Sequence, residues 1–455
     1  MGDLLSAILA FVVAISVLVA VHEYGHYIVG RWCGMKVLRF SIGFGKPIWK
    51  RIGKGPDRTE YCISSIPLGG YVRFLDSREG AVDPEDEGRA FNQRPIPARI
   101  AVLLAGPFFN FLFAILAYWA LFIYGVPAAY PAVGEVDEGS FADVAGLETG
   151  ERIVAVGGAD TPDWEATLVA MLAEMTADGR IPIELQDADG NVRTAVIDVG
   201  DERTRLTEPG LLFEGLGFRP WRPAVIVSEV IEGGPAEAAG FEDGDRIVAV
   251  ANEAVNVTSD VINLIGARAD QTVAVDIVRD GEPMTLQTRV DSVVENGEAV
   301  GRIDVRIGAD WGDMLYLRQY GPIESVGKGI ERMWRSTTFT VTMLSRMVTG
   351  DVSIKNISGP LAIAQYAGAS AQQGAESFLG FLAIVSISLG VLNLLPVPVL
   401  DGGQIVYQLI EAAKGGPMSE RAQIIGQQLG ILALILLMSL AFYNDITGSL
   451  FNPGG

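Results

Sequence analysis

Long uncharged apolar stretches dominate the hydrophobic pattern of the chain. They cover Leu4–Val21, Ile100–Tyr124, Ser377–Leu400 and Ile424–Tyr443. Roughly 20 apolar residues cross the hydrocarbon core of a bilayer as a helix, so each stretch is long enough to span. The first continues through Trp32, and the last is the weakest because Gln427 and Gln428 lie near its start. The pattern predicts a multi-pass α-helical membrane protein with four transmembrane helices.

An internal repeat lies between the second and third stretches. Segments 145–156 and 239–250 match with an offset of 94 residues, and both contain Arg-Ile-Val-Ala-Val after a glycine turn. A period of this length is typical of one small domain that occurs twice. Each copy continues into a helical pattern, Trp164–Met175 in the first and Ser259–Ala269 in the second, and then into alternating strands.

Both copies resemble PDZ domains, in which an Ala-Gly-x-x-x-Gly-(Asp/Glu)-x-Ile-Val stretch recurs. The first copy ends with Gly215-Leu216-Gly217-Phe218, which is similar to the carboxylate-binding loop of that family, and Val300-Gly301-Arg302-Ile303 is a looser counterpart. The late position of these loops suits the circularly permuted bacterial form. The resemblance implies two α+β domains inserted between the second and third spans. Such domains bind a peptide C-terminus by strand pairing, or bind no peptide and exclude bulky substrates sterically.

The loop after the first stretch mixes β-branched and aromatic residues with glycine. Cys62–Phe74 contains a Pro-Leu-Gly-Gly break, which predicts a strand, a turn and a second strand. Val37–Trp49 predicts an earlier strand or hairpin. A short membrane-associated sheet could offer its open edge to an extended peptide. The alternative is a purely structural hairpin.

The segment between the repeat and the third stretch contains one helical pattern. Apolar residues follow helical spacing from Ile323 to Val348, with basic residues such as Lys328 between them and Trp334 among them. The pattern predicts an amphipathic helix, which would suit either the membrane surface or packing against the repeated domains.

Composition sets limits on partners and compartments. The 455 residues are 49% hydrophobic, with a net charge of −21 and a mean hydropathy of +0.31. Residues 126–310 hold 36 Asp and Glu against 13 Arg and no Lys, which argues against nucleic acid as a partner and indicates a solvated surface. Residues 30–99 hold 13 Lys and Arg against 8 Asp and Glu, so the positive-inside rule places this loop in the cytoplasm. Two cysteines, Cys33 and Cys62, provide neither a disulfide framework nor a cysteine-rich zinc site.

Metal-binding chemistry is concentrated near the end of the first apolar stretch. His22-Glu23-Tyr24-Gly25-His26 places two histidines four residues apart, so on a helix they face the same way, with Glu23 beside the first. This is the His-Glu-x-x-His pattern, in which two imidazoles bind Zn²⁺ and the glutamate acts as a general base. The chain contains only two histidines, and both are in this motif.

The motif lies within a predicted membrane helix. A cleaved signal peptide is the competing interpretation, but Asp3 stands where a basic segment is expected, and the polar motif replaces a small-residue cleavage site. Ionisable groups at membrane depth are costly and are usually functional. A bound metal would compensate for that cost.

A third metal ligand is expected near the end of the third stretch. Catalytic zinc usually has three protein ligands, and two histidines leave one to be supplied. Asn393–Gly403 contains two closely spaced prolines, and irregular backbone at membrane depth is tolerated where it lines a cavity. Asp401 is its only carboxylate, so we expect it to bind the metal; its alternative role is a helix cap. Asn110, in the second stretch, is predicted to take part in helix packing after Pro107, with a catalytic role as the alternative.

Taken together, the motif, the repeat and the Asn393–Gly403 segment resemble the site-2 protease family of intramembrane zinc metalloproteases, over essentially the whole chain. The resemblance implies that His22, His26 and Asp401 ligate one Zn²⁺ per chain and that Glu23 is the catalytic base. It further implies that Asn393 hydrogen-bonds the substrate backbone.

The same resemblance implies the substrates and the location. Gly69, Gly70 and Tyr71 match the membrane-associated β-element that holds the substrate as a strand. The implied activity is regulated intramembrane proteolysis of single-pass membrane proteins that another protease has trimmed, of the anti-sigma factor type, and of remnant signal peptides. The implied location is the bacterial inner membrane, with the PDZ domains periplasmic and the active site toward the cytoplasmic side.

The expected domain plan follows from these elements. It comprises residues 1–125 with two spans and the zinc motif, PDZ domains at 126–220 and 221–310, an extracytoplasmic amphipathic segment at 311–376, and two further spans at 377–455.

Two other functions remain open from the sequence. A membrane-anchored PDZ scaffold with a structural metal would lose function when the PDZ pair is removed but not in a Glu23→Gln variant. A different intramembrane zinc enzyme of the same family would differ in the substrates that an inactive variant traps.

Overall fold

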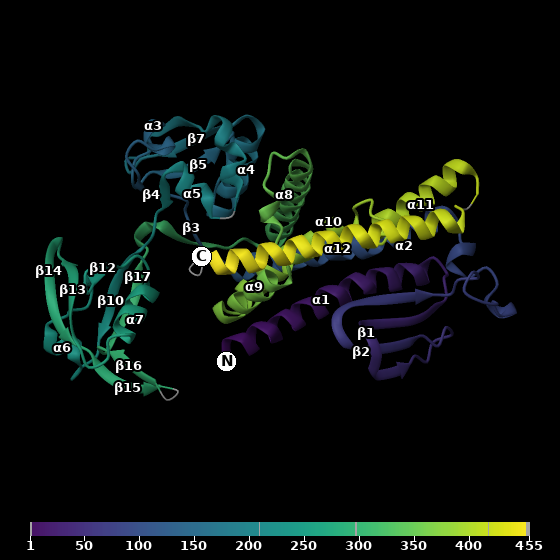
Figure 1. The fold of residues 1–455 in the computed structure, drawn as a ribbon, viewed down its shortest axis with the longest axis horizontal. Helices are drawn as coiled ribbons and strands as arrows, with labels where there is room; N and C mark the ends of the chain where they lie inside the picture. Colours follow the sequence, from purple (N-terminus) through teal and green to yellow (C-terminus); the bar gives the residue numbers. More distant parts are fainter. Residues whose placement is uncertain (1, 209, 296–297, 417, 452–455) are drawn as a thin grey trace. The chain divides into compact units, whose positions relative to one another are not determined.

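The computed structural model describes residues 2–451 except 209, 296–297 and 417 (Figure 1). It divides into two compact units. The first unit comprises Met1–Val126, Asp201–Leu212 and Leu317–Gly455, and the second comprises Pro127–Gly200 and Phe213–Tyr316.

The first unit contains the long apolar helices. Its main elements are α1 (Gly2–Trp32), β1 (Val37–Ile52), β2 (Glu60–Phe74), α2 (Ile96–Tyr124), α8 (Pro322–Thr349), α9 (Pro360–Gln373), α10 (Ala375–Asn393), α11 (Asp401–Lys414) and α12 (Glu420–Phe451). Within α1, α2, α10 and α12 lie four helical segments that are long and apolar enough to cross a membrane, so the four predicted spans are helices.

The third predicted span is shorter than expected. Its helix, α10, ends at Asn393 rather than Leu400, and α11 begins at Asp401. The intervening residues contain Pro396 and Pro398, which lack the backbone N–H that a continuing helix needs. Helix α11 was not predicted from the sequence.

Small side chains bring the helices of the first unit together. Ala114 and Ala117 of α2 are buried against Ala383 and Ile387 of α10. The predicted amphipathic helix is α8, and it packs on α2 and α10. A Cβ at Gly329 of α8 would lie only 3.1 Å from a backbone oxygen of α2, so glycine permits this close approach.

Strands β1 and β2 both reverse direction part-way along, so the turn predicted within Cys62–Phe74 is confirmed. The first half of β1 pairs on one side with the end of β2 and on the other with its start, since Ile42 lies opposite both Gly70 and Ile63. The second half of β1 pairs with the start of β2, as in Arg51 opposite Tyr61. Gly69, with a positive φ of +125°, lies in the reversal of β2 between Ile66 and Gly70.

The second unit holds both copies of the repeat. The first copy contains β4 (Val133–Val136), α3 (Phe141–Val144), β5 (Arg152–Val156), β6 (Ala159–Asp160), α4 (Trp164–Asp178), β7 (Arg180–Gln186), β8 (Val192–Asp198) and β9 (Phe218–Pro220). The second contains β10 (Ala224–Val230), α6 (Pro235–Ala239), β11 (Arg246–Val250), β12 (Glu253–Ala254), α7 (Thr258–Gly266), β13 (Thr272–Arg279), β14 (Glu282–Arg289), β15 (Asp291–Glu295), β16 (Glu298–Arg302) and β17 (Val305–Asp310).

The two copies have the same order of elements around corresponding strands. The repeated pentapeptide forms β5 in one and β11 in the other. In the first copy the sheet order is β6-β5-β7-β8, and in the second it is β14-β13-β11-β10-β17 with β12 beside β11. Helix α4 lies between β6 and β7 in the first copy, and α7 lies between β12 and β13 in the second. Ile153 of β5 and Ile247 of β11 are buried at corresponding positions.

Candidate metal centre

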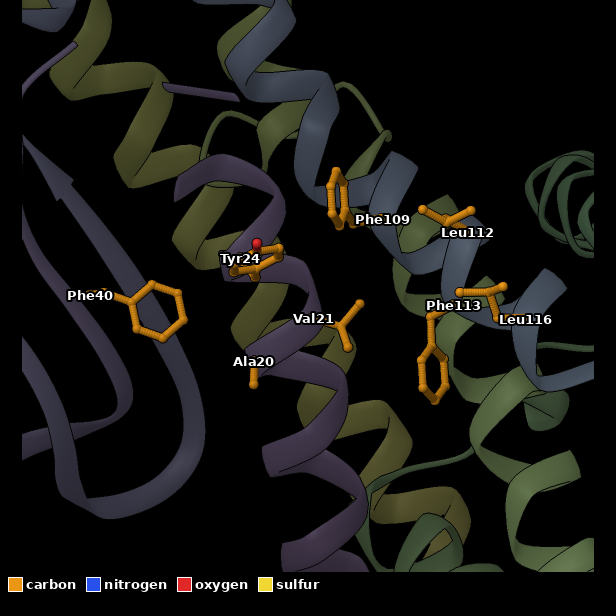
Figure 2. A pocket seen from close by; sticks show the side chains of 8 residues that line it. All are labelled: Ala20, Val21, Tyr24, Phe40, Phe109, Leu112, Phe113 and Leu116. Atoms are coloured by element: carbon orange, nitrogen blue, oxygen red, sulfur yellow. The ribbon is translucent and has the colours of Figure 1, made fainter. Parts of the chain in front are cut away.

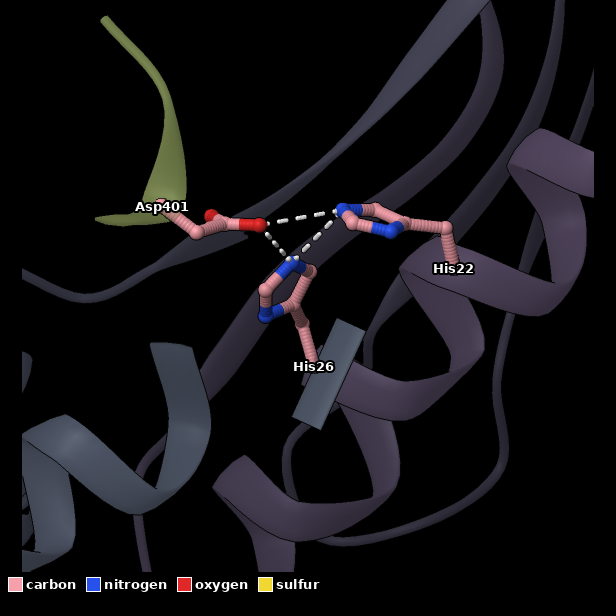
Figure 3. Close-up of side chains that lie close together, drawn as sticks. All are labelled: His22, His26 and Asp401. Carbon is pink, nitrogen blue, oxygen red and sulfur yellow. Dashed lines mark hydrogen bonds and ion pairs between the residues drawn. The ribbon is translucent and has the colours of Figure 1, made fainter. Parts of the chain in front are cut away.

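Three side chains from the two ends of the chain meet in the first unit. Figure 3 shows His22 and His26 of α1 directed toward Asp401, the first residue of α11. The His22 and His26 Nε2 atoms are 3.2 Å apart, and they lie 3.2 Å and 3.4 Å from the Asp401 Oδ2 atom. Both histidines are only 8% exposed. The structure therefore brings together the three residues that the sequence singled out as metal ligands.

The geometry of these atoms fits zinc. A tetrahedral zinc with ligand distances of about 2.0–2.1 Å separates neighbouring ligand atoms by roughly 3.3–3.4 Å. The three observed separations match this edge. Moreover, the buried Asp401 Oδ2 atom accepts no hydrogen bond from the described residues. One carboxylate oxygen and two unprotonated imidazole nitrogens are a suitable set of ligand atoms for a divalent cation.

Glycine keeps the space around the ligand atoms open. A Cβ at Gly106 of α2 would lie 2.4 Å from the His26 Nε2 atom and 2.7 Å from the His22 Nε2 atom. Carbon and nitrogen atoms in contact are normally about 3.5 Å apart. Any side chain at this position would therefore displace both imidazoles.

The far nitrogen of each imidazole is held by α2. His26 Nδ1 lies 2.7 Å from the Val102 carbonyl oxygen, which can only accept, so Nδ1 carries the proton and Nε2 presents its lone pair. His22 Nδ1 lies 3.0 Å from the Asn110 side-chain amide. The Asn110 atom facing His22 Nδ1 is Nδ2, and Asn110 Oδ1 is buried without a partner among the described residues. Metal ligation by Nε2 requires a proton on Nδ1, and exchanging the oxygen and nitrogen of the amide, which have the same shape, makes the Asn110 oxygen its acceptor.

Asn110 is the residue whose role the sequence did not reveal. The prediction assigned it to helix packing, whereas its side chain is fully buried against His22. Its backbone oxygen does take part in packing, because it accepts a hydrogen bond of 2.9 Å from Ser386 Oγ of α10. Asn110 lies four residues after Gly106, so the two face the same way on α2. This spacing was the one feature of the sequence that could have placed Asn110 beside the histidines.

Glu23 and the end of β2 lie next to each other. A Cβ at Gly70 would be 3.2 Å from the Glu23 Cγ atom and 2.7 Å from the Ser41 carbonyl oxygen. This part of β2 pairs only with β1 among the described strands. Tyr71 stacks on Phe44 with parallel rings 6.2 Å apart, which stiffens the strand. An unpaired strand edge thus borders the glutamate of the motif.

Within the described part of the chain, the structure shows no contact between Asn393 and His22, His26 or Asp401. It is the last residue of α10 and is half-buried, and its side chain has no hydrogen-bond partner among the residues that the structure describes. The backbone that follows is tightly packed, since a Cβ at Gly402 would lie 2.2 Å from the Leu394 oxygen and one at Gly403 would lie 2.1 Å from the Val397 oxygen. The glycines after Asp401 are therefore required by packing.

An apolar groove of about 440 Å³ lies on another side of α1 (Figure 2). Its lining comprises Ala20, Val21, Tyr24, Phe40, Phe109, Leu112, Phe113 and Leu116. Tyr24 is two residues from His22 and points to the opposite side of the helix. The groove is adjacent to the motif in sequence, but apart from the Tyr24 hydroxyl its lining is apolar.

A polar pocket of about 350 Å³ lies at the end of the β1–β2 sheet, and Lys36, Arg39, Asp57 and Glu60 help to line it. The hydrogen bonds from Lys50 and Arg39 lower the pKa of Glu60. Glu60 is therefore ionised and paired at neutral pH, and Asp57 forms an ion pair with Arg89.

Comparison with known proteins assigns the chain to a family. The model of peptidase family M50 matches residues 10–437. The chain belongs to peptidase family M50. The regulator of sigma-E protease RseP of Escherichia coli K12 is 38% identical over 453 residues, covering 96% of this chain and 98% of the relative. A protease RseP of Yersinia pestis is 39% identical over 98% of this chain and 100% of its own length. This M50 peptidase is accordingly a zinc metalloprotease of the site-2 type.

Solved structures give a weaker comparison for the M50 chain. The PDZ domain of an SdrC-like protein from Listeria monocytogenes is 18% identical, with a TM-score of 0.18, covering 20% of this chain and 92% of that domain. At this TM-score the likeness does not establish the fold of either repeat copy.

Proposed function

We propose that this M50 peptidase hydrolyses a peptide bond within or near the transmembrane segment of a single-pass membrane protein, in regulated intramembrane proteolysis. The observation that carries the proposal is the convergence of His22, His26 and Asp401 at the separations that one zinc requires. In this proposal one Zn²⁺ is bound per chain, and the general base, Glu23, lies beside its first ligand on α1.

Each residue of the site has a chemical role in the proposed reaction. Bound zinc supplies Lewis acidity that polarises the scissile carbonyl and acidifies the attacking water. Glu23 takes a proton from that water and afterwards donates it to the leaving amine. The Val102 oxygen and the Asn110 amide keep the two imidazoles in the required tautomer.

The substrate must unwind to reach the site, because a helix shields its own carbonyls by hydrogen bonds. We propose that Gly69, Gly70 and Tyr71 receive the unwound stretch as an added strand, which the unpaired edge beside Glu23 supports. Asn393 would hydrogen-bond the substrate backbone. Its amide has no partner among the described residues, which leaves it available for this role.

Proteins of the anti-sigma factor type are the proposed substrates, after another protease has removed their outer domain, together with remnant signal peptides. The repeated domains of the second unit, proposed to be PDZ domains, would exclude substrates that are still bulky or bind a new C-terminus. The basic loop at residues 30–99 supports an orientation with the active site toward the cytoplasm and these domains in the periplasm of an inner-membrane protein.

The experiment that tests the proposal is cleavage of single-pass reporters in liposomes. One reporter carries a short outer stub and the other an intact folded outer domain. The proposal expects wild type to cut the first far faster than the second, and Glu23→Gln to cut neither. Equal cleavage by Glu23→Gln would remove the base from the mechanism. Function that survives in Glu23→Gln but not after deletion of the repeated domains would instead favour a scaffold.

A further inference from the structure

One face of α2 contacts both histidines of the motif. Val102, Gly106 and Asn110 follow each other at intervals of four residues, so they form one stripe along the helix. Val102 accepts from His26, Asn110 contacts His22, and Gly106 leaves room for both rings. The next position of the stripe toward the N-terminus, three residues before Val102, is Arg99.

Arg99 forms a two-point ion pair with Glu411 of α11. Its Nη1 and Nη2 atoms donate to the two carboxylate oxygens at 3.0 Å and 2.6 Å. Arg99 is only 7% exposed, and 312 residues separate the partners in sequence. The hydrogen bond from Arg99 lowers the pKa of Glu411 against the opposing effect of partial burial, so the carboxylate is charged at neutral pH.

The ion pair acts on the helix that begins with the third metal ligand. Glu411 follows Asp401 by ten residues in α11, which is about 15 Å along the helix axis. The first turn of α11 is held by its own preceding loop, as in the 2.7 Å bond from Gln404 Nε2 to the Pro398 oxygen. Such contacts within one segment do not fix Asp401 relative to α1, whereas a bond to α2 does.

We infer that Arg99 and Glu411 are positioning residues for the third zinc ligand: their ion pair holds α11 against the α2 face that supports His22 and His26. The inference rests on the proposed ligand set. Through this pair, α2 orients all three ligands, two by direct contact and Asp401 by way of its helix. Groups that hydrogen-bond the ligands directly change metal affinity by about 10–100-fold when they are removed. Since this pair acts through a helix rather than by direct contact, we expect an effect at the lower end of that range.

The test measures zinc affinity of the full chain in detergent by competition with a chelator. Arg99→Gln and Glu411→Gln are each expected to weaken zinc binding about tenfold or more. The matched control is Lys355→Gln, which breaks an exposed ion pair with Glu208, 2.7 Å long, in the same unit. This control is expected to bind zinc within about twofold of wild type, because exposed pairs contribute little.

A second pair of variants separates positioning from folding. Glu411→Gln leaves a buried guanidinium without its partner and can fail to fold, so the double variant Arg99→Met/Glu411→Leu replaces both charges by apolar groups of similar size. We expect it to fold and still to bind zinc about tenfold more weakly. The charge-swapped double variant Arg99→Glu/Glu411→Arg is expected to recover part of the affinity. Thermal unfolding of the zinc-free proteins reports folding independently.

The outcomes are distinguishable. Weaker zinc binding in folded variants, with unchanged binding in Lys355→Gln, supports the inference. Zinc affinity within twofold of wild type in any folded variant that lacks the pair overturns it. A loss of thermal stability without a loss of zinc affinity also overturns it, because the pair would then be only structural. If wild type itself binds no zinc, the proposed ligand set fails, and the positioning role fails with it.

Discussion

Replacement of Gly106 by alanine tests the metal centre with a single methyl group. The added Cβ would lie 2.4 Å from the His26 Nε2 atom and 2.7 Å from the His22 Nε2 atom. Because non-bonded contact requires about 3.5 Å, the two nitrogens must withdraw by about 1 Å or α2 must move by a similar distance. Metal–ligand distances tolerate errors of only about 0.2 Å. We therefore expect Gly106→Ala to weaken zinc binding by at least about 100-fold.

The assay for Gly106→Ala is zinc content after dialysis, followed by chelator competition on the purified protein. The matched control is Gly380→Ala in α10, where the new Cβ would make only an ordinary contact of 3.9 Å with Leu121. This control also replaces glycine in a membrane helix and is expected to retain one zinc per chain. The reasoning is refuted if Gly106→Ala folds and binds zinc as tightly as Gly380→Ala does.

Three further predictions concern other parts of the structure. Asn110→Ala should weaken zinc about tenfold in chelator competition, because His22 loses the acceptor for its Nδ1 proton; unchanged affinity would contradict this role. Gly70→Ala should lower cleavage of the reporter at least about tenfold without loss of zinc, since its Cβ would lie 2.7 Å from a neighbouring carbonyl oxygen, and full activity would refute the strand-edge role. Asp245→Asn should cost about 2 kcal/mol in urea unfolding at pH 7. Burial alone would raise the pKa of Asp245, but the hydrogen bonds from Arg279 and the Glu242 amide lower it, so this stabilisation is present above the unfolded pKa and is lost as the pH falls through the folded one. A difference between Asp245→Asn and wild type that stays constant down to acid pH would contradict this assignment.

The sequence predicted the shared orientation of the two motif histidines because local spacing determines it. On a helix, His22 and His26 must face the same way, and the structure has both on α1. Asp401 could be proposed because a third ligand was needed and no other carboxylate lay near the end of its span. Residue spacing did not predict helix α11, which begins at Asp401. Its start depends on the tight packing of Gly402 and Gly403 on the preceding loop, which is a tertiary effect.

Tertiary contacts account for the features that the sequence did not predict. The turn at the Pro-Leu-Gly-Gly run is local and was predicted, whereas the close approach of Gly69 to Phe44 and of Gly70 to Ser41 cannot be seen in the sequence. The pairing of Arg99 with Glu411 joins residues 312 positions apart, and no local pattern specifies such a partner. The contact of Asn110 with His22 depends in the same way on how α2 packs against α1.

The most direct test of the central claim is zinc titration of the chelator-stripped protein in liposomes, with cleavage of the short-stub reporter as the readout. We predict that activity is absent without metal and rises to a plateau at one zinc per chain. Glu23→Gln should bind the same amount of zinc and remain inactive. Cleavage by metal-free wild type, or full activity in zinc-loaded Glu23→Gln, would contradict the account.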